Sequence, residues 1–213
     1  MSLTAAENIE RHTATIFDTD LPLVNASRNG DASAFGELVK KYDRKLYRVA
    51  QGIVHKHEDA EEVVQTAFLK AYLNLHRFQG NAKFSTWLIR IAINESFMQL
   101  RKQTSSKEQP FDVDNGFGDD EGNQNRLDVA DWAANPESLY SATELRQILE
   151  NCLQKLQPRL SVVFFLRDIE GHSIGEISRI LNITATAVKT RLSRARILLR
   201  EELTPYFKKA ALR

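Results

Sequence analysis

The stretch SIGEISRILNITATAVKTRLSRARILLR, residues 173–200, decides the fold of the C-terminal part of the chain. Ser173 and Glu176 occupy the N-cap and N3 positions of a capping box, so a helix is predicted to begin after Ser173. Asn182 ends that helix, and Thr184 is placed to cap the next one. Two helices joined by such a short turn have the spacing of a helix-turn-helix.

The second of these helices has two different faces. At 100° per residue one narrow arc is apolar and is expected to face the core; its members are Val188, Leu192, Ala195 and Leu199. The opposite face carries hydroxyls first and long cations beyond, an order that suits the major groove of DNA. An exposed basic helix alone is more often a solvated surface, but the capped helix and short turn before it favour DNA contact. The candidate contacts on this face and its flanks are Thr186, Lys189, Thr190, Arg191, Ser193, Arg194 and Arg196.

Composition limits the remaining possibilities. The chain has 213 residues, of which 42% are hydrophobic, so it can form one large domain or two small ones. Gly and Pro are sparse and strict polar–apolar alternation is rare, which predicts an all-α protein. The single cysteine, Cys152, excludes an internal disulfide framework. Without a secretory signal or a long apolar run, a cytoplasmic location is expected.

The net charge of +1 conceals a pattern along the chain. Counted from the sequence, the charge is −2 over residues 1–19, +4 over 20–103, −7 over 104–137 and +6 over 138–213. Two basic blocks separated by an acidic one suggest a polyanionic partner that is contacted twice. Two solvated domains with a charged linker would give the same pattern.

Apolar spacing predicts helices in both basic blocks and none between them. The first block is predicted to hold helices over 31–54, 59–75 and 84–102, the last capped by Ser85 or Thr86. The second block begins with helices over 145–156 and 159–170, ahead of the helix-turn-helix. The segment 104–137 is rich in Asp, Asn, Gly and Ser, so it is predicted to be a flexible acidic linker.

Four stretches in this order resemble the extracytoplasmic-function (ECF) sigma factors, the compact branch of the bacterial sigma-70 family. They are AFGELVKKYDRKLYRVA, DAEEVVQTAFLKAY, RFQGNAKFSTWLIRIAINE and LQPRLSVVFFLRDIEGHSIGEISRILNITATAVKTRLSRAR. The resemblance covers about 20–103 and 138–205. It implies a sigma region 2 over 20–103 and a sigma region 4 over 138–213, with 1–19 as an N-terminal extension.

The resemblance also implies functional residues. Asp59, Glu62 and Gln65 match polar positions that bind the β′ clamp helices of core RNA polymerase. The residues expected to open the minus-ten promoter element and hold its single strand are Asn81, Lys83, Phe84, Ser85, Thr86, Arg90 and Asn94. Lys189, Thr190, Ser193 and Arg194 match positions that read the minus-thirty-five element, with Thr186, Arg191 and Arg196 nearer the DNA backbone.

The expected partners are therefore core polymerase, through its β′ clamp helices and β flap, promoter DNA and an anti-sigma factor. No phosphate-binding glycine loop, nucleophile elbow or zinc-hydrolase motif is present, so no enzymatic activity, cofactor or metal is expected. His55 and His57 are interpreted as solvated loop residues. Two alternatives remain: a helix-turn-helix regulator that does not bind core polymerase as a sigma subunit, and an enzyme with a nucleic-acid-binding tail.

Overall fold

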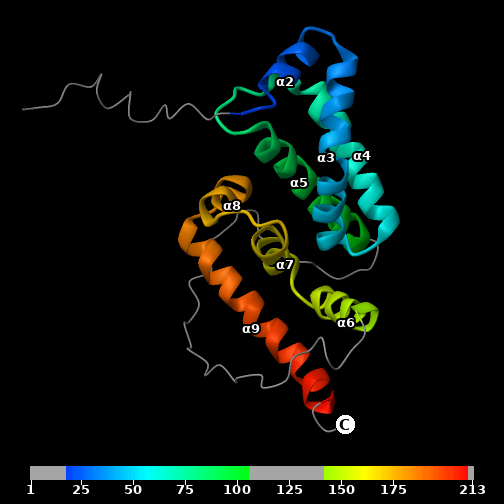
Figure 1. Cartoon of the computed structure of the whole chain (residues 1–213), viewed down its shortest axis with the longest axis vertical. Helices are drawn as coiled ribbons and strands as arrows, with labels where there is room; N and C mark the ends of the chain where they lie inside the picture. Colours follow the sequence, from blue (N-terminus) through cyan, green and yellow to red (C-terminus); the bar gives the residue numbers. More distant parts are fainter. Residues whose placement is uncertain (1–17, 106–141, 211–213) are drawn as a thin grey trace, which may run out of the picture.

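The computed structural model describes residues 18–105 and 142–210, and every regular element in these ranges is a helix (Figure 1). The all-α prediction is therefore confirmed. Of the predicted linker and N-terminal extension, residues 106–137 and 1–17 lie outside the described residues. The helices form two units, one on each side of residues 106–141 (Figure 1).

The N-terminal unit is built on three long helices that pack on one another in every pairwise combination. Its elements are α2 (Leu21–Arg28), α3 (Ala32–Val54), α4 (His57–Leu73), the short η1 (Leu75–Arg77) and α5 (Phe84–Ser105). The three predicted helices are all present. Sequence reasoning missed α2, a short helix with Pro22 in its first turn that packs on α3.

The C-terminal unit contains the helix-turn-helix. Its elements are α6 (Ala142–Gln154), α7 (Pro158–Phe164), the π-helical turn η3 (Phe165–Ile169), α8 (Ile174–Leu181) and α9 (Ala185–Ala210). The α9 helix runs along α7 and α8 and continues past them to α6 (Figure 1).

The predicted caps around α8 are all present. The Ser173 N–H donates to Glu176 Oε2 at 2.9 Å, and the Glu176 N–H donates to Ser173 Oγ at 3.2 Å, which completes the capping box. Asn182 ends α8 in the left-handed region with φ of 55°. The Thr184 hydroxyl accepts from the Ala187 N–H at 3.1 Å and so caps α9. Short-range interactions therefore set where α8 begins and ends and where α9 begins.

The predicted cap of α5 is wrong. The helix begins at Phe84, and the Phe84 N–H donates to the carboxylate of Asp18 at 2.6 Å. The Trp87 N–H is already bonded to the Lys83 carbonyl at 3.2 Å, so it does not need a Ser85 or Thr86 cap. A residue 66 positions earlier in the chain supplies the cap.

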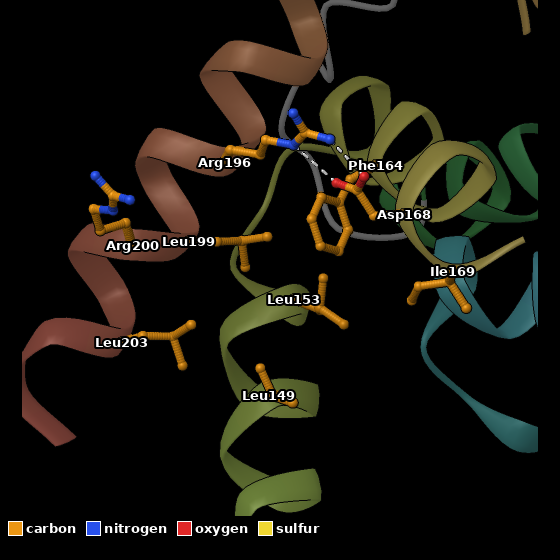
Figure 2. A pocket seen from close by; sticks show the side chains of 9 residues that line it. All are labelled: Leu149, Leu153, Phe164, Asp168, Ile169, Arg196, Leu199, Arg200 and Leu203. Atoms are coloured by element: carbon orange, nitrogen blue, oxygen red, sulfur yellow. Dashed lines mark hydrogen bonds and ion pairs between the residues drawn. The ribbon is translucent and has the colours of Figure 1, made fainter. Parts of the chain in front are cut away.

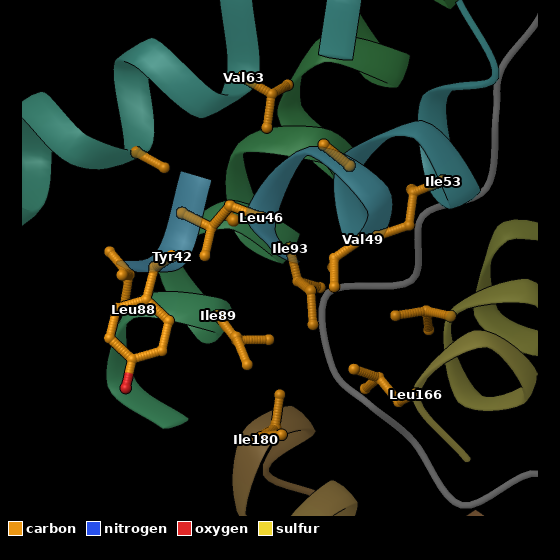
Figure 3. Close-up of a cluster of buried hydrophobic side chains, with 14 of the residues drawn as sticks. Tyr42, Leu46, Val49, Ile53, Val63, Leu88, Ile89, Ile93, Leu166 and Ile180 are labelled. Atoms are coloured by element: carbon orange, nitrogen blue, oxygen red, sulfur yellow. The ribbon is translucent and has the colours of Figure 1, made fainter. Parts of the chain in front are cut away.

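The two units share one apolar core. In Figure 3, Val49, Ile53, Ile89 and Ile93 of the N-terminal unit lie opposite Leu166 and Ile180 of the C-terminal unit, and all six belong to a single buried cluster. Fully burying a side chain of this size stabilises the fold by about 1.5–3 kcal/mol. A second cluster between α6, α7 and α9 includes Cys152, which is fully buried. The predicted apolar arc of α9 is confirmed, since Val188, Leu192, Ala195 and Leu199 are all buried.

Candidate nucleic-acid interface

The start of α9 presents a polar surface on the side away from its buried arc. Thr186, Lys189 and Ser193 are exposed, and Thr190 and Arg194 are half-buried. These five side chains occur within two and a half turns of one helix, at the end that the helix-turn-helix holds in place. Hydroxyl and ammonium groups in that arrangement can reach base edges and phosphates of a duplex.

Two of the predicted DNA contacts on α9 are placed differently from the others. Arg191 is buried, with 6% of its surface exposed, because its helical angle lies beside the apolar arc that packs on α7 and α8. Arg196 is paired with Asp168 of η3, with its Nη2 2.6 Å and its Nε 3.0 Å from the carboxylate oxygens. This bidentate bond raises the pKa of the Arg196 guanidinium. An incoming phosphate would have to compete with Asp168 for Arg196.

Three aromatic rings pack together at the start of α5, where the second DNA contact is predicted. Phe78, Phe84 and Trp87 have ring centroids 5.4–5.8 Å apart. Phe84 is fully buried and Trp87 is half-buried. Trp87 packs on both phenylalanine rings, and Phe84, expected to contact a DNA strand, lies in the core instead of on the surface.

The remaining residues predicted at the minus-ten position lie around this aromatic group. Asn81 and Lys83 are exposed in the loop before α5, and Ser85 and Thr86 in its first turn are half-buried. Arg90 and Asn94 are exposed, and they lie one turn apart on the same side of the helix as Thr86. The loop and one face of α5 thus both present polar side chains to solvent.

Buried carboxylates hold this loop in place, and sequence reasoning missed them. Asp18 Oδ2 accepts from the Phe84 N–H, and Asp18 Oδ1 accepts from the Asp20 N–H at 3.1 Å. Asp20, which is 2% exposed, accepts from the Tyr42 hydroxyl and pairs with the Lys41 ammonium. Desolvation, together with the bond to Asp20, raises the pKa of Tyr42. No local pattern reveals this network, because its members come from distant positions in the chain.

A separate acidic surface lies at the start of α4. Glu62 and Gln65 are exposed and Asp59 is half-buried, as a solvated face would be. The Gln99 side-chain amide donates to both Asp59 and Glu62 at 3.0 Å, and the Gln103 amide donates to Asp59 at 2.7 Å. Sequence reasoning missed both glutamines, which are on α5. They hold the carboxylates in one orientation.

The same side of α4 continues into exposed apolar residues. Leu69 and Leu73 are 59% and 61% exposed, and the helical period places both in line with Glu62 and Gln65. A surface that is acidic at one end and apolar at the other fits a polypeptide better than nucleic acid, whose phosphates it would repel.

An apolar groove of about 450 Å³ lies between α6, η3 and α9 (Figure 2). Leu149, Leu153, Phe164, Ile169, Leu199 and Leu203 line it, and the Arg196–Asp168 pair and Arg200 lie at its rim. The groove offers no nucleophile or proton-transfer group beyond these ion-paired side chains. Within the described ranges, no group of three His, Cys, Asp or Glu is placed to bind a metal, and no helix is long and apolar enough to cross a membrane.

Comparisons with known proteins match both units. The model of the family described as Sigma-70 region 2 matches residues 38–106, and that of Sigma-70, region 4 matches residues 146–199. The chain is 34% identical over 176 residues to the ECF RNA polymerase sigma factor SigW of Bacillus subtilis (strain 168), covering 83% of this chain and 92% of SigW.

Two solved structures have a similar fold. The structure of CnrH in complex with the cytosolic domain of CnrY matches with a TM-score of 0.63 and 24% identity, covering 88% of this chain and 99% of that one. The sigma factor RpoE from Bartonella quintana, in complex with the anti-sigma factor NepR, matches with a TM-score of 0.59 and 24% identity, covering 80% of this chain and 96% of that one.

Proposed function

The chain belongs to the ECF branch of the sigma-70 family of RNA polymerase sigma factors, and from this membership we propose that it binds core RNA polymerase and directs it to promoters. It recognises a minus-thirty-five and a minus-ten element and promotes melting of the DNA near the second. The observation that carries the proposal is the order of the two matched segments, each of which presents an exposed polar face in the structure.

The C-terminal unit, proposed as sigma region 4 over 138–213, reads the minus-thirty-five element with α9. Lys189, Thr190, Ser193 and Arg194 contact base edges, and Thr186 contacts the backbone. Lys189 and Ser193 are exposed near the N-terminal end of α9, next to the turn of the helix-turn-helix, and this supports the assignment. Arg191 is buried and is left out of the proposed contacts.

The N-terminal unit, proposed as sigma region 2 over 20–103, opens the minus-ten element at the start of α5. Flipping a base out of the stack costs a few kcal/mol, which contacts to the displaced base must offset. Asn81, Lys83, Ser85, Thr86, Arg90 and Asn94 supply polar contacts to the strand. Because Phe84 is buried, its proposed role is to hold the loop rather than to stack on a base.

The acidic start of α4 is the proposed contact with the β′ clamp helices. Asp59, Glu62 and Gln65 form it, and the hydrogen bonds from Gln99 support a fixed orientation of both carboxylates. The chemistry of RNA synthesis belongs to the polymerase, so this chain acts without enzymatic activity or a cofactor of its own. We further propose that it works in the cytoplasm under the control of an anti-sigma factor, as the ECF family implies.

A transcription assay tests the function directly. Purified chain and core polymerase are incubated with a pool of templates in which both promoter elements are randomised, and the 5′ ends of the transcripts are sequenced. We expect initiation at one family of paired elements, absent with core polymerase alone. Lys189→Ala should weaken selection at the minus-thirty-five element, by about 1–3 kcal/mol for a lost base contact, and leave the minus-ten preference unchanged. Failure to bind core polymerase, or to direct any initiation, contradicts the proposal.

A further inference from the structure

The segment 79–83, called the minus-ten loop below, lies between two buried phenylalanines. Phe78 before it is 4% exposed and Phe84 after it is fully buried, with their ring centroids 5.8 Å apart. Gly80 has a φ of 75°, in the left-handed region that glycine adopts without strain, so the chain can turn between the two rings. The conformation of the loop therefore depends on how Phe78 and Phe84 are held.

The end of the loop is held by Asp18. Its Oδ2 accepts from the Phe84 N–H at 2.6 Å, and its Oδ1 accepts from the Asp20 N–H at 3.1 Å. Asp18 is 8% exposed, so little water is available to replace either bond. This carboxylate therefore fixes the backbone at the first residue of α5, directly before Ser85 and Thr86.

The beginning of the loop is held by Arg28, the last residue of α2. The Arg28 Nε donates to the Leu75 carbonyl at 3.0 Å, and the guanidinium carbon lies 6.0 Å from the centroid of the Phe78 ring, within the range of a cation–π contact. One short segment, 18–28, thus reaches both ends of the minus-ten loop. It precedes residues 38–106, which match the model of sigma-70 region 2.

The cap from Asp18 changes what the start of α5 offers to DNA. The residue before the helix is Lys83, whose ammonium can only donate and so cannot cap the helix N–H groups. A carboxylate at a helix N-terminus also occupies the place where a phosphate would otherwise bind. A DNA strand at this position is therefore held by the polar side chains of the loop and of α5, and the conformation of the loop decides where those side chains lie.

A second connection runs from the same segment through Tyr42 to Ser85. The Tyr42 hydroxyl donates to Asp20, and the Tyr42 ring centroid lies 6.0 Å from that of Phe84. Desolvation and the bond to Asp20 raise the pKa of Tyr42, and a hydrogen bond from Ser85 acts in the opposite direction. Ser85, one of the proposed strand contacts, is therefore linked to the same residues that hold the loop.

We propose that residues 18–28 position the minus-ten loop for DNA opening, with Asp18 and Arg28 as positioning residues that act through the loop. The inference rests on the proposed function for its consequence, whereas the support of the loop does not. Without either contact the loop takes several conformations, and only some of them hold a displaced base. Discrimination between bases at the minus-ten element therefore falls, while α9 reads the minus-thirty-five element as before.

Four substitutions separate this role from a general loss of stability. Asp18→Ala removes the contact at α5, and Asp18→Asn keeps an oxygen that can accept from the Phe84 N–H. Asp31→Ala is the matched control, because Asp31 caps α3 in the same unit by accepting from two N–H groups in the first turn of that helix. Arg28→Ala removes the other contact at an exposed position, and it is expected to fold even where Asp18→Ala does not. Far-UV circular dichroism of the full chain checks that each variant is folded.

Hydrogen exchange in the full chain without polymerase, followed by NMR, tests the support of the loop. The Phe84 amide reports the bond to Asp18, and the amide of Ala67, buried in the middle of α4, reports opening of the whole unit. We expect the ratio of the Phe84 rate to the Ala67 rate to rise at least about tenfold in Asp18→Ala. The ratio should stay within about threefold of the unchanged value in Asp18→Asn and Asp31→Ala.

Both promoter preferences are read from the same transcripts of the randomised template pool, so the fraction of folded protein affects them equally. Asp18→Ala and Arg28→Ala should lower the enrichment of the preferred minus-ten bases by at least about fivefold and leave the minus-thirty-five enrichment within about twofold. Asp18→Asn and Asp31→Ala should stay within about twofold of the unchanged chain at both elements.

The inference is overturned if folded Asp18→Ala keeps the minus-ten preference, if it lowers both preferences alike, or if the exchange ratio does not rise. Where Asp18→Ala does not fold, Arg28→Ala decides by its effect on the two preferences. If the unchanged chain directs no initiation, the proposed function fails, and the exchange rates still decide whether Asp18 holds the loop.

Discussion

The two candidate DNA surfaces are held in place by different kinds of interaction. Around the start of α9, the hydrogen bonds that cap the two helices are short in sequence: Ser173 with Glu176, and Thr184 with Ala187. At the start of α5, the loop depends on Asp18, which lies 66 positions before the N–H that it caps. The surface at the start of α9 is therefore capped by residues close in sequence. The surface at the start of α5 needs a contact between distant parts of the chain.

From this difference we expect the two surfaces to respond differently to the same type of change. When an exposed helix cap is lost, the uncapped backbone N–H can donate to water instead, so the loss of stability is limited. Loss of a buried carboxylate leaves other buried groups without a partner, and the cost is larger. Three measurements test this contrast.

The largest effect is expected from Asp20→Ala. This change leaves the Tyr42 hydroxyl buried without its acceptor and removes the partner of Lys41. We expect the free energy of unfolding to fall by about 3 kcal/mol, at the lower end of the range for a broken buried pair because Lys41 stays partly hydrated. Urea denaturation measures the change. Asp43→Ala, at an exposed position of α3, is the matched control and should change stability by less than about 0.5 kcal/mol.

Ser173→Ala should have a smaller effect. It removes the acceptor for the Glu176 N–H at the start of α8, and loss of an N-cap typically costs about 1 kcal/mol. The same urea experiment measures it, and Ser173→Thr, which keeps a capping oxygen, should recover most of the loss. A cost as large as that of Asp20→Ala would contradict the contrast between local and long-range support.

The smallest effect is expected in acid. Hydrogen bonds from the backbone and hydroxyl of Ser173 lower the pKa of Glu176 below its usual value of 4.5. A lowered folded-state pKa contributes stability that is present above pH 4.5 and lost as pH falls through the folded-state value. Stability of the unchanged chain should therefore decline more steeply below pH 4.5 than that of Glu176→Gln, which can still complete the capping box. Parallel acid profiles for the two proteins would show that Glu176 makes no such contribution.

The sequence predicted the C-terminal half more completely than the N-terminal half for the same reason. The capping box, the turn at Asn182 and the apolar arc of α9 all depend on positions within one or two helical turns, and the structure confirms each of them. The three long helices of the N-terminal unit were also predictable from their apolar period. The cap of α5 and the glutamines that hold Asp59 were not, because their partners are far away in the sequence.

By itself, the sequence determined the all-α class, the helix-turn-helix and the resemblance to ECF sigma factors, since these follow from periodicity and from short motifs in a fixed order. Only the tertiary structure decided that Phe84 is buried, that Arg191 faces the protein and that two blocks read as separate domains share one core. The physical reason is that burial depends on what packs against a helix. A helical period shows which residues share a face, but the partner of that face can come from anywhere in the chain.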